Sequence, residues 1–270
     1  MKEKHEQWNV IFIGAGNVAW HLGHELLKNG VKVSQVISRT VSSAQKLASA
    51  LGAAYSNNLK DLIPDANVCI ISISDDVLGE VLDNAEFGNS LVLHTAGSIP
   101  LEIFKGHAKN YGVFYPFQTI TRGRRLNWKK IPFLIEASSA ANLRKTRELA
   151  ALISDCVLEI DSLTRMYLHL AAVFASNFSN HMYALAEKIM VEQGLSFDIL
   201  KPLISETATK VMKVKPVKAQ TGPAIRGNKI IMEKHLNMLE HHPEMQELYR
   251  LISESIWAMK SEKLKTKNQK

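Results

Sequence analysis

Short apolar runs alternate with amphipathic stretches over the first 160 residues of the chain. The runs are rich in Val, Ile and Leu, which is typical of strands buried on both faces of a parallel sheet. The predicted strands lie at residues 9–13, 31–37, 53–56, 68–73, 90–94, 111–114, 132–136 and 157–160. The predicted helices lie at residues 17–29, 42–51, 77–84 and 140–153, and a helical turn is predicted at 58–62. Residues 74–76 are expected to cap the helix at 77–84. Such alternation predicts an α/β fold with a doubly wound, mostly parallel sheet.

Beyond Asp161 the pattern changes, because Gly and Pro become rarer and long helical periods take over. Residues 162–193 could form one helix closed by Gly194, and its middle, residues 167–178, is apolar nearly all round, which predicts burial on several sides. Later helices are predicted at about 197–211, 228–240 and 243–263. We therefore expect two domains, 1–160 and 161–270, of which the second is all-helical. A helical domain of this size has little core of its own, so we expect a homodimer through it.

The first apolar run leads directly into a G-x-G-x-x-A motif. This motif between a strand and a helix is typical of a turn that binds a dinucleotide pyrophosphate at the helix N-terminus. Gly14 permits the tight turn, Gly16 lets peptide N–H groups approach the phosphates, and Ala19 keeps the helix close to the sheet. The expected pyrophosphate-binding residues are Gly14, Ala15, Gly16, Asn17, Val18 and Ala19. The alternative is a glycine turn that binds no ligand.

The end of the second predicted strand selects the cofactor. NAD sites usually carry an Asp or Glu there, but this chain has no carboxylate between Glu25 and Asp61 and instead has Ser38, Arg39 and Thr40. A guanidinium and two hydroxyls suit the 2′-phosphate of NADP, which a carboxylate would repel. The sequence therefore predicts NADP(H). The alternative is that Arg39 is an ordinary solvated cation.

Two further strand ends should lie at the same edge of the sheet, since ligands bind at the carboxyl ends of parallel strands. The predicted cofactor-binding residues at these ends are Ser72, Ile73, Ser74, Thr95, Ala96 and Gly97. Ordinary turn chemistry is the alternative for each of them.

Polar side chains interrupt the apolar middle of the long predicted helix. At about 100° per residue, His169, Ser176 and Asn180 fall on one stripe, with Asn177 beside it. Buried polar groups need partners, and a substrate with a nicotinamide ring could supply them. We expect His169 as general acid/base and the two amides as groups that orient the reacting atom. The alternative is that these side chains bond to other helices in the core.

The segment 221–228 is a Gly- and Pro-containing loop that leads into a helix. Arg226 stands near that helix N-terminus and could bind a carboxylate or phosphate of the substrate. A rigid turn with an exposed arginine is the alternative.

Composition narrows the class of protein further. The chain has 270 residues, of which 46% are hydrophobic, so it can bury a large core. Two cysteines do not make a disulfide framework, the N-terminus is polar, and no apolar run approaches the roughly 18 residues of a membrane span. These features favour a cytoplasmic protein with no membrane partner. The net charge is +7, but the tail 260–270 holds five Lys and one Glu, or +4, which leaves about +3 for the body. We expect no nucleic-acid partner and no metal site.

Six motifs together resemble a two-domain family of NADP oxidoreductases that has a Rossmann domain and a helical C-terminal domain of unknown function. The motifs are residues 14–19, 38–40, 94–98, 115–119, 169–177 and 221–227. More distantly, the chain is similar to the superfamily of pyrroline-carboxylate reductase, ketopantoate reductase and 6-phosphogluconate dehydrogenase. The resemblance implies hydride transfer to or from a C=O or C=N carbon, a substrate held between the domains and a dimer through the helices.

One departure from the superfamily concerns the proton donor. The hydroxyacid dehydrogenase relatives place a catalytic Lys, then an Asn one turn later, on the first helix after the Rossmann domain. This chain has no Lys between Lys145 and Lys188, although Asn177 could fill the Asn role. The proton donor would therefore have to be His169 or a group that the sequence does not reveal.

These observations predict an NADP(H)-dependent oxidoreductase that acts on a small, anionic carbonyl or imine substrate. A non-catalytic NADP-binding sensor or regulatory protein is the first alternative, and the missing Lys favours it. A deazaflavin-dependent NADP reductase is the second alternative, because such reductases share the N-terminal fold.

Overall fold

The computed structural model describes residues 8–63 and 66–267, with side chains described as far as Ser261. The backbone divides into two compact units, residues 1–176 and 177–270. Strands give way to helices at residues 160–162, so the first helix after the sheet belongs to the first unit.

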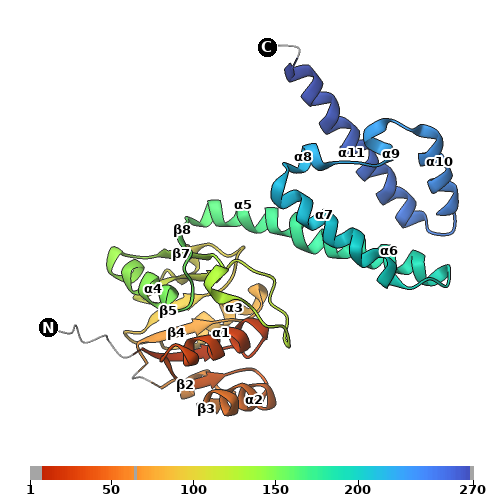
Figure 1. Ribbon diagram of the computed structural model, residues 1–270. Helices are drawn as coiled ribbons and strands as arrows, with labels where there is room; N and C mark the ends of the chain where they lie inside the picture. The colour runs from red at the N-terminus through yellow and green to blue at the C-terminus, as the bar shows by residue number, and fades with distance from the viewer. Residues whose placement is uncertain (1–7, 64–65, 268–270) are drawn as a thin grey trace. The chain divides into compact units, whose positions relative to one another are not determined.

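The first unit is built on one sheet with the strand order β3-β2-β1-β4-β5-β6-β7-β8 (Figure 1). The strands are β1 (Asn9–Ile13), β2 (Lys32–Ile37), β3 (Ala54–Ser56), β4 (Val68–Ile71), β5 (Leu91–His94), β6 (Asn110–Pro116), β7 (Phe133–Ala137) and β8 (Val157–Glu159). Neighbouring strands are parallel except β6 and β7, which are antiparallel. The predicted mostly parallel α/β sheet is confirmed.

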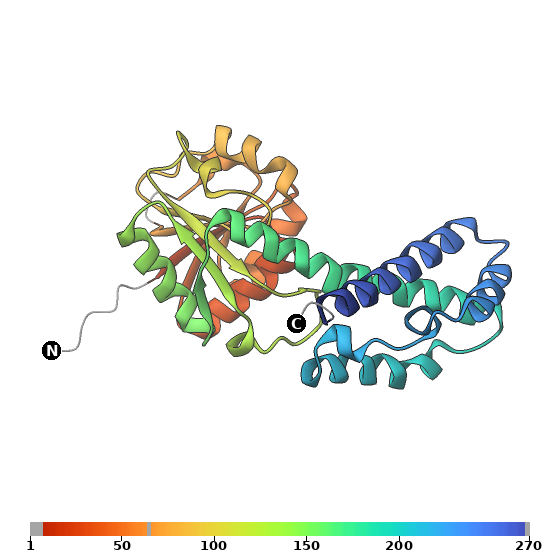
Figure 2. The ribbon, with the colours of Figure 1, turned by 90° about the horizontal axis from the view of Figure 1, so that it is seen from above.

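Helices cover both faces of this sheet and enclose two apolar cores. Helices α1 (Asn17–Lys28), α2 (Val41–Leu51) and α4 (Ala140–Ile153) contribute to the first core, while α3 (Leu78–Asn84) and the 3₁₀ helix η3 (Leu101–Phe104) contribute to the second. In Figure 2, the red α1 and the light-green α4 lie on one side of the strands and the orange α3 on the other. Successive strand residues alternate between the cores, as Phe12 and Ile13 do. Each fully buried large side chain contributes about 2 kcal/mol.

The strand order reverses direction between β1 and β4, because β2 follows β1 on one side and β4 lies on the other. At such a reversal the connecting loops part and leave a crevice outside the carboxyl ends of the strands. The loops after β1, β2, β4, β5 and β6 all open toward this edge. The topology therefore brings the predicted cofactor-binding segments together.

Several predicted boundaries shift by one or a few residues. The fourth strand ends at Ile71 rather than residue 73, so Ser72 and Ile73 belong to the loop. Residues 74–76 do not cap an α-helix directly, because a 3₁₀ turn, η2 (Asp75–Val77), precedes α3 and the Ser74 side chain makes no capping hydrogen bond. The turn predicted at 58–62 is the 3₁₀ helix η1 (Leu59–Asp61). The two 3₁₀ segments η1 and η2 are short turns, and short helical turns and helix ends often adopt 3₁₀ rather than α geometry.

The long helix predicted over 162–193 is helical throughout but not α-helical throughout. It consists of α5 (Ser162–Ala172), a π-helical segment (Val173–Phe178) and α6 (Ser179–Glu192). A π turn contains one residue more than an α turn, so side chains beyond it rotate away from their α-helical positions. The single stripe of His169, Ser176 and Asn180 is therefore wrong.

The predicted burial of residues 167–178 is also wrong for the single chain. Tyr167 and Phe174 are 65% and 64% exposed, and Leu170 and Phe178 are about half exposed. The apolar pattern predicts a core, whereas these side chains are exposed in the single chain.

The second unit continues from α6 through short and long helices. They are η6 (Phe197–Leu200), α7 (Lys201–Lys213), α8 (Pro216–Ala219), α9 (Pro223–Arg226), α10 (Lys229–Met238) and α11 (Pro243–Lys267). The helix predicted at 197–211 thus begins with a 3₁₀ turn and extends to Lys213. Asn228 caps α10 by accepting a hydrogen bond from the Ile231 N–H at 3.2 Å. No helix within the described ranges is both long and apolar enough to cross a membrane.

Candidate functional site

A cleft of about 900 Å³ lies at the carboxyl ends of the strands, within the first unit. It is lined by nearly all the predicted cofactor-binding residues, namely Gly14, Ala15, Gly16, Asn17, Val18, Ser38, Arg39, Thr40, Ser72, Ile73, Ser74, Thr95, Ala96 and Gly97. Ala19 is the exception, because it is fully buried on the side of α1 that packs against the sheet. Ala19 thus has the packing role that the motif predicts for it, and no surface on the cleft.

Gly14 makes the turn between β1 and α1 possible. Its φ angle is +107°, a region that side chains with a Cβ avoid. Its N–H donates to the Ile37 carbonyl at 2.7 Å, which ties the turn to β2. A Cβ on Gly14 would lie 2.1 Å from the Ser72 carbonyl oxygen. The turn therefore requires glycine for both backbone conformation and close approach to β4.

The start of α1 has the properties of an anion site. No acidic residue occupies its first turn, and Gly16 precedes it without a side-chain capping hydrogen bond. A Cβ on Gly16 would meet nothing within 4 Å, so this glycine faces open space. Peptide N–H groups and the positive end of the helix dipole are therefore open to a phosphate. The residues present fit a dinucleotide pyrophosphate.

The end of β2 supplies the features expected for a 2′-phosphate. Arg39 is exposed on the cleft, and the Thr40 hydroxyl donates to the Ser43 hydroxyl at 2.8 Å just before α2 begins. The first turn of α2 contains no acidic residue. A guanidinium, hydroxyls and a helix N-terminus all favour a phosphate dianion here.

Tyr115 and His169 form a hydrogen-bonded pair on the cleft wall. The Tyr115 hydroxyl and His169 Nδ1 are 3.2 Å apart, although the residues come from β6 and α5. A Cβ on Gly97 would lie 2.6 Å from His169 Nδ1 and 2.8 Å from Tyr115 Cζ, so both rings pack against bare backbone after β5. Burial, followed by the charge of Asp75, raises the pKa of Tyr115. The phenol is therefore protonated near neutral pH.

A buried ion pair fixes α5, and with it His169, to the sheet. Arg165 is fully buried one helical turn before His169, and its Nη1 donates to Glu136 Oε2 on β7 at 2.6 Å. Its Nη2 donates to the Ile99 carbonyl at 2.6 Å, in the loop after β5. The Ser162 hydroxyl donates to the same Glu136 oxygen at 2.7 Å. Charge-assisted bonds of this kind hold a helix in one register.

His94 ends β5 behind the cleft wall. It is 1% exposed, its ring stacks on Phe104, and its Nδ1 accepts the Ala96 N–H at 3.2 Å. Burial and the nearby positive charge of Arg165 lower its pKa from 6.5 to about 3. His94 is therefore neutral and structural, and it shapes the Thr95–Gly97 loop.

The remaining predicted catalytic residues lie outside this cleft. Ser176 belongs to the first unit, where its hydroxyl is 2.8 Å from that of Thr119. Asn177 and Asn180 belong to the second unit and are exposed, as is Arg226. Arg226 ends the short helix α9 within the segment predicted as a loop, and this helix is tied down, because Ala224 is buried and Lys260 donates to the Ile225 carbonyl at 2.9 Å.

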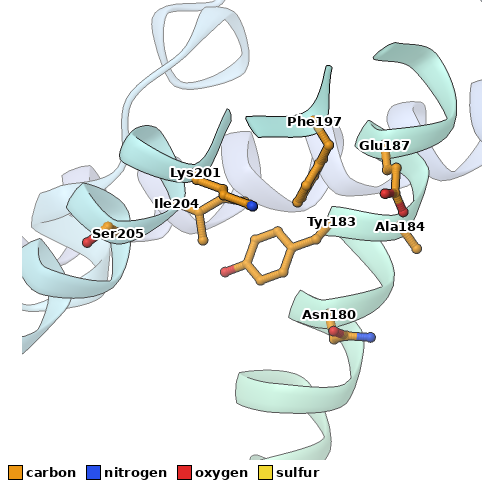
Figure 3. Close-up of a pocket in the computed structure, with 8 residues that line it drawn as sticks. All are labelled: Asn180, Tyr183, Ala184, Glu187, Phe197, Lys201, Ile204 and Ser205. Carbon is orange, nitrogen blue, oxygen red and sulfur yellow. The ribbon is translucent and has the colours of Figure 1, made fainter. Parts of the chain in front are cut away.

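Asn180 lines a separate pocket of about 480 Å³ within the second unit. Figure 3 shows Asn180 and Tyr183 on α6, with the Tyr183 ring directed toward Lys201 and Ile204 on α7. The pocket is lined by two aromatic rings, Tyr183 and Phe197, and by polar side chains, those of Asn180, Glu187, Lys201 and Ser205. Its character is that of a helix–helix groove.

Tyr115, Arg165 and Arg122 are not among the site residues that the sequence predicts. Tyr115 lies within the motif 115–119 that the family resemblance already marked. Arg165 is a charge in an apolar helix, a pattern that often signals a buried ion pair. Arg122 stands in the basic run 122–125 of the loop after β6, and no local pattern indicates where that loop folds.

Two models of known protein families match separate parts of the chain. The family model described as "Domain of unknown function (DUF2520)" matches residues 131–256, and the model described as shikimate/quinate 5-dehydrogenase matches residues 1–86. No curated protein matches the chain.

Solved structures give the broader relationship. The chain is 43% identical to a protein from Bacteroides fragilis described as "putative NADP oxidoreductase BF3122", with 93% of this chain and 98% of that one covered and a TM-score of 0.88. Protein TM1727 from Thermotoga maritima is 22% identical, with 94% and 99% covered and a TM-score of 0.69. An imine reductase from Myxococcus stipitatus in complex with NADP+ is 16% identical, with 96% and 94% covered and a TM-score of 0.61. The last two share the fold with this chain.

Proposed function

The chain belongs to the family of BF3122 from Bacteroides fragilis, and on that premise we propose that it is an NADP(H)-dependent oxidoreductase acting on a small, anionic carbonyl or imine substrate. The observation that carries the proposal is the cleft in the first unit, where the Gly14–Gly16 turn and Arg39 line one continuous surface. The imine reductase with the same fold binds NADP+, which supports the choice of cofactor.

The turn and the start of α1 would hold the pyrophosphate, while Ser38, Arg39 and Thr40 would hold the 2′-phosphate. Bound NADPH supplies the hydride for reduction of a C=O or C=N carbon. Ser72, Ile73, Ser74, Thr95, Ala96 and Gly97 would then form the wall against which the nicotinamide part is placed.

His169 is the proposed acid/base, with Tyr115 as the group that positions its proton. In the proposed arrangement the Tyr115 hydroxyl donates to His169 Nδ1, which places the ring proton of His169 on Nε2. That Nε2–H is then the donor for the substrate oxygen or nitrogen. Tyr115→Phe should lower kcat by about 10-fold with little change in KM, whereas loss of mere packing would lower thermal stability alone.

Substrate recognition is proposed for residues of the second unit and for Ser176. Asn177 and Asn180 would orient the reacting atom, and Arg226 would neutralise the substrate anion. Arg226→Ala should raise KM more than it lowers kcat, and the reverse pattern would reject this role.

A homodimer through the helical part is also proposed. Of the described side chains in the second unit, only those of Ala224 and Met245 are buried hydrophobics, while large apolar residues on α6, η6 and α7 are exposed. A second copy of the chain would cover such faces.

The test of the proposed function is NADPH oxidation with a panel of 2-oxo acids, cyclic imines and their uncharged analogues. Turnover that prefers an anionic carbonyl or imine supports it. Tight NADPH binding without turnover on any member would instead support a sensor or regulatory protein. Reduction of a deazaflavin by NADPH, with no reaction on the panel, would support the deazaflavin reductase.

A further inference from the structure

The loop after β6, residues 117–127, folds back onto helix α1. The Thr121 carbonyl is 3.0 Å from His21 Nε2, and Ile120 packs against the core beneath α1 while also lining the cleft. Two residues further on, this loop carries Arg122. The loop thus lies beside the N-terminal half of α1. The contact between Arg122 and Ala15 joins residues that are 107 positions apart in the sequence.

Arg122 is held in place by two contacts with the beginning of α1. Its guanidinium lies over the Trp20 ring, 4.5 Å from the ring centroid. Its Nη2 donates to the Ala15 carbonyl oxygen at 3.3 Å. Ala15 is the middle residue of the Gly14–Gly16 turn, so a guanidinium touches the backbone of the phosphate-binding turn itself.

The charge of Arg122 is not neutralised by a carboxylate. Among the residues that the structure describes, no Asp or Glu lies within ion-pair distance of it, and α1 has no acidic residue in its first turn. A guanidinium has several N–H donors in a planar fork, and the Ala15 carbonyl uses one of them. Stacking on an indole ring leaves the edge of that fork open to oxygen ligands.

A pyrophosphate carries two negative charges that the turn alone compensates only in part, because a helix N-terminus supplies about half a positive charge. A guanidinium beside the same turn adds a full charge and a bidentate donor geometry that suits phosphate. We propose that Arg122 is a further cofactor-binding residue, which binds the dinucleotide pyrophosphate together with the peptide N–H groups at the start of α1. This role rests on the proposed function, because it requires a dinucleotide in the cleft.

Arg122 and Arg39 would then divide the recognition of NADPH. Arg39 lies after β2 and would bind the 2′-phosphate, so it would contribute to the preference for NADPH over NADH. Arg122 would bind the pyrophosphate, which NADPH and NADH share. Its removal should therefore weaken both cofactors to the same extent and leave their ratio unchanged.

The experiment measures dissociation constants by calorimetry for NADPH, NADH and adenosine 2′-monophosphate, which lacks the pyrophosphate. Arg122→Ala should raise the constants for NADPH and NADH by about 10- to 100-fold each, with no change for the monophosphate. Arg122→Lys should recover part of the loss, since it keeps the charge but not the fork. Arg124→Ala, in the same exposed loop, is the matched control and should match the wild type. Arg39→Ala should raise the constants for NADPH and the monophosphate but not for NADH.

Three results would overturn the role of Arg122. The first is an unchanged NADPH constant in Arg122→Ala, and the second is equal weakening of the monophosphate, which would indicate a collapsed loop. The third is equal weakening in Arg124→Ala, which would indicate a general effect of loop charge. Absence of NADPH binding to the wild-type protein is a different outcome, because it would remove the proposed function itself.

Discussion

The two units of the chain differ most in how they bury their apolar residues. In the first unit, two cores enclose the sheet, and residues such as Phe12, Leu22 and Phe114 have no exposed surface. In the second unit, the helices leave apolar residues such as Ile199 and Leu203 more than 60% exposed. The comparison teaches that helical pattern and core formation are separate properties. Local sequence suffices for the helices, whereas their apolar faces stay exposed in a single copy of the chain.

The largest expected effect concerns that uncovered surface. Ile199 lies in η6 and Leu203 in the first turn of α7, and both are more than 60% exposed. Replacing both by Glu would bury charges in the proposed dimer interface and should raise the dimer dissociation constant by about 1,000-fold. Light scattering after size exclusion should then give the monomer mass.

Tyr55→Glu with Leu158→Glu is the matched control, because these exposed apolar residues lie in the first unit. The control should keep the wild-type mass. A wild-type monomer, or a mass unchanged by the Ile199/Leu203 pair, would contradict the proposal that the second unit completes its core with a second copy.

The next effect compares one glycine from each unit. Gly14→Ala should lower the free energy of unfolding by about 3 kcal/mol. The alanine would adopt a strained φ angle, and its Cβ would clash with the Ser72 carbonyl oxygen. Gly194→Ala should cost about 1–2 kcal/mol, since Gly194 also has a positive φ, of +68°, but open space around its Cβ position. Urea unfolding followed by circular dichroism measures both. Equal losses would show that crowding at the turn contributes nothing.

A smaller effect comes from the buried histidine of the first unit. The pKa of His94 is lowered to about 3, so its stabilising contribution is complete above the unfolded value of 6.5 and is lost as the pH falls from there toward 3. Between pH 6.5 and 5 the free energy of unfolding should decrease by about 2 kcal/mol through this group alone.

His94→Asn keeps an acceptor near the Ala96 N–H and should remove this part of the pH dependence. His241→Gln, at an exposed position in the second unit, is the control and should leave it unchanged. The same slope in His94→Asn as in the wild type would show that another group titrates on unfolding.

Much of the first unit could be predicted from the sequence because its signals are local. The run 9–13 and the turn at Gly14 each depend on neighbours within a few residues. The predicted cofactor-binding segments line one cleft, because the topology places the carboxyl ends of parallel strands at the same edge of the sheet. Only Ala19 does not reach the cleft.

The parts that could not be predicted depend on contacts between distant segments. Tyr115 meets His169 across 54 residues, and Arg122 meets Ala15 across 107. Neither separation leaves a periodic signal. The π segment at 173–178 has no distinctive composition either, so a uniform helical rotation placed Ser176 and Asn180 on a stripe that does not exist.

The central claim is that the cleft of the first unit binds NADP(H), with Arg39 recognising the 2′-phosphate. Calorimetric titration of the wild type and of Arg39→Ala with NADPH and NADH tests it most directly. We expect the wild type to bind NADPH at least about 10-fold more tightly than NADH, and Arg39→Ala to lose that preference by weakening NADPH alone. Equal affinities in the wild type, or no heat with either nucleotide, would contradict the claim.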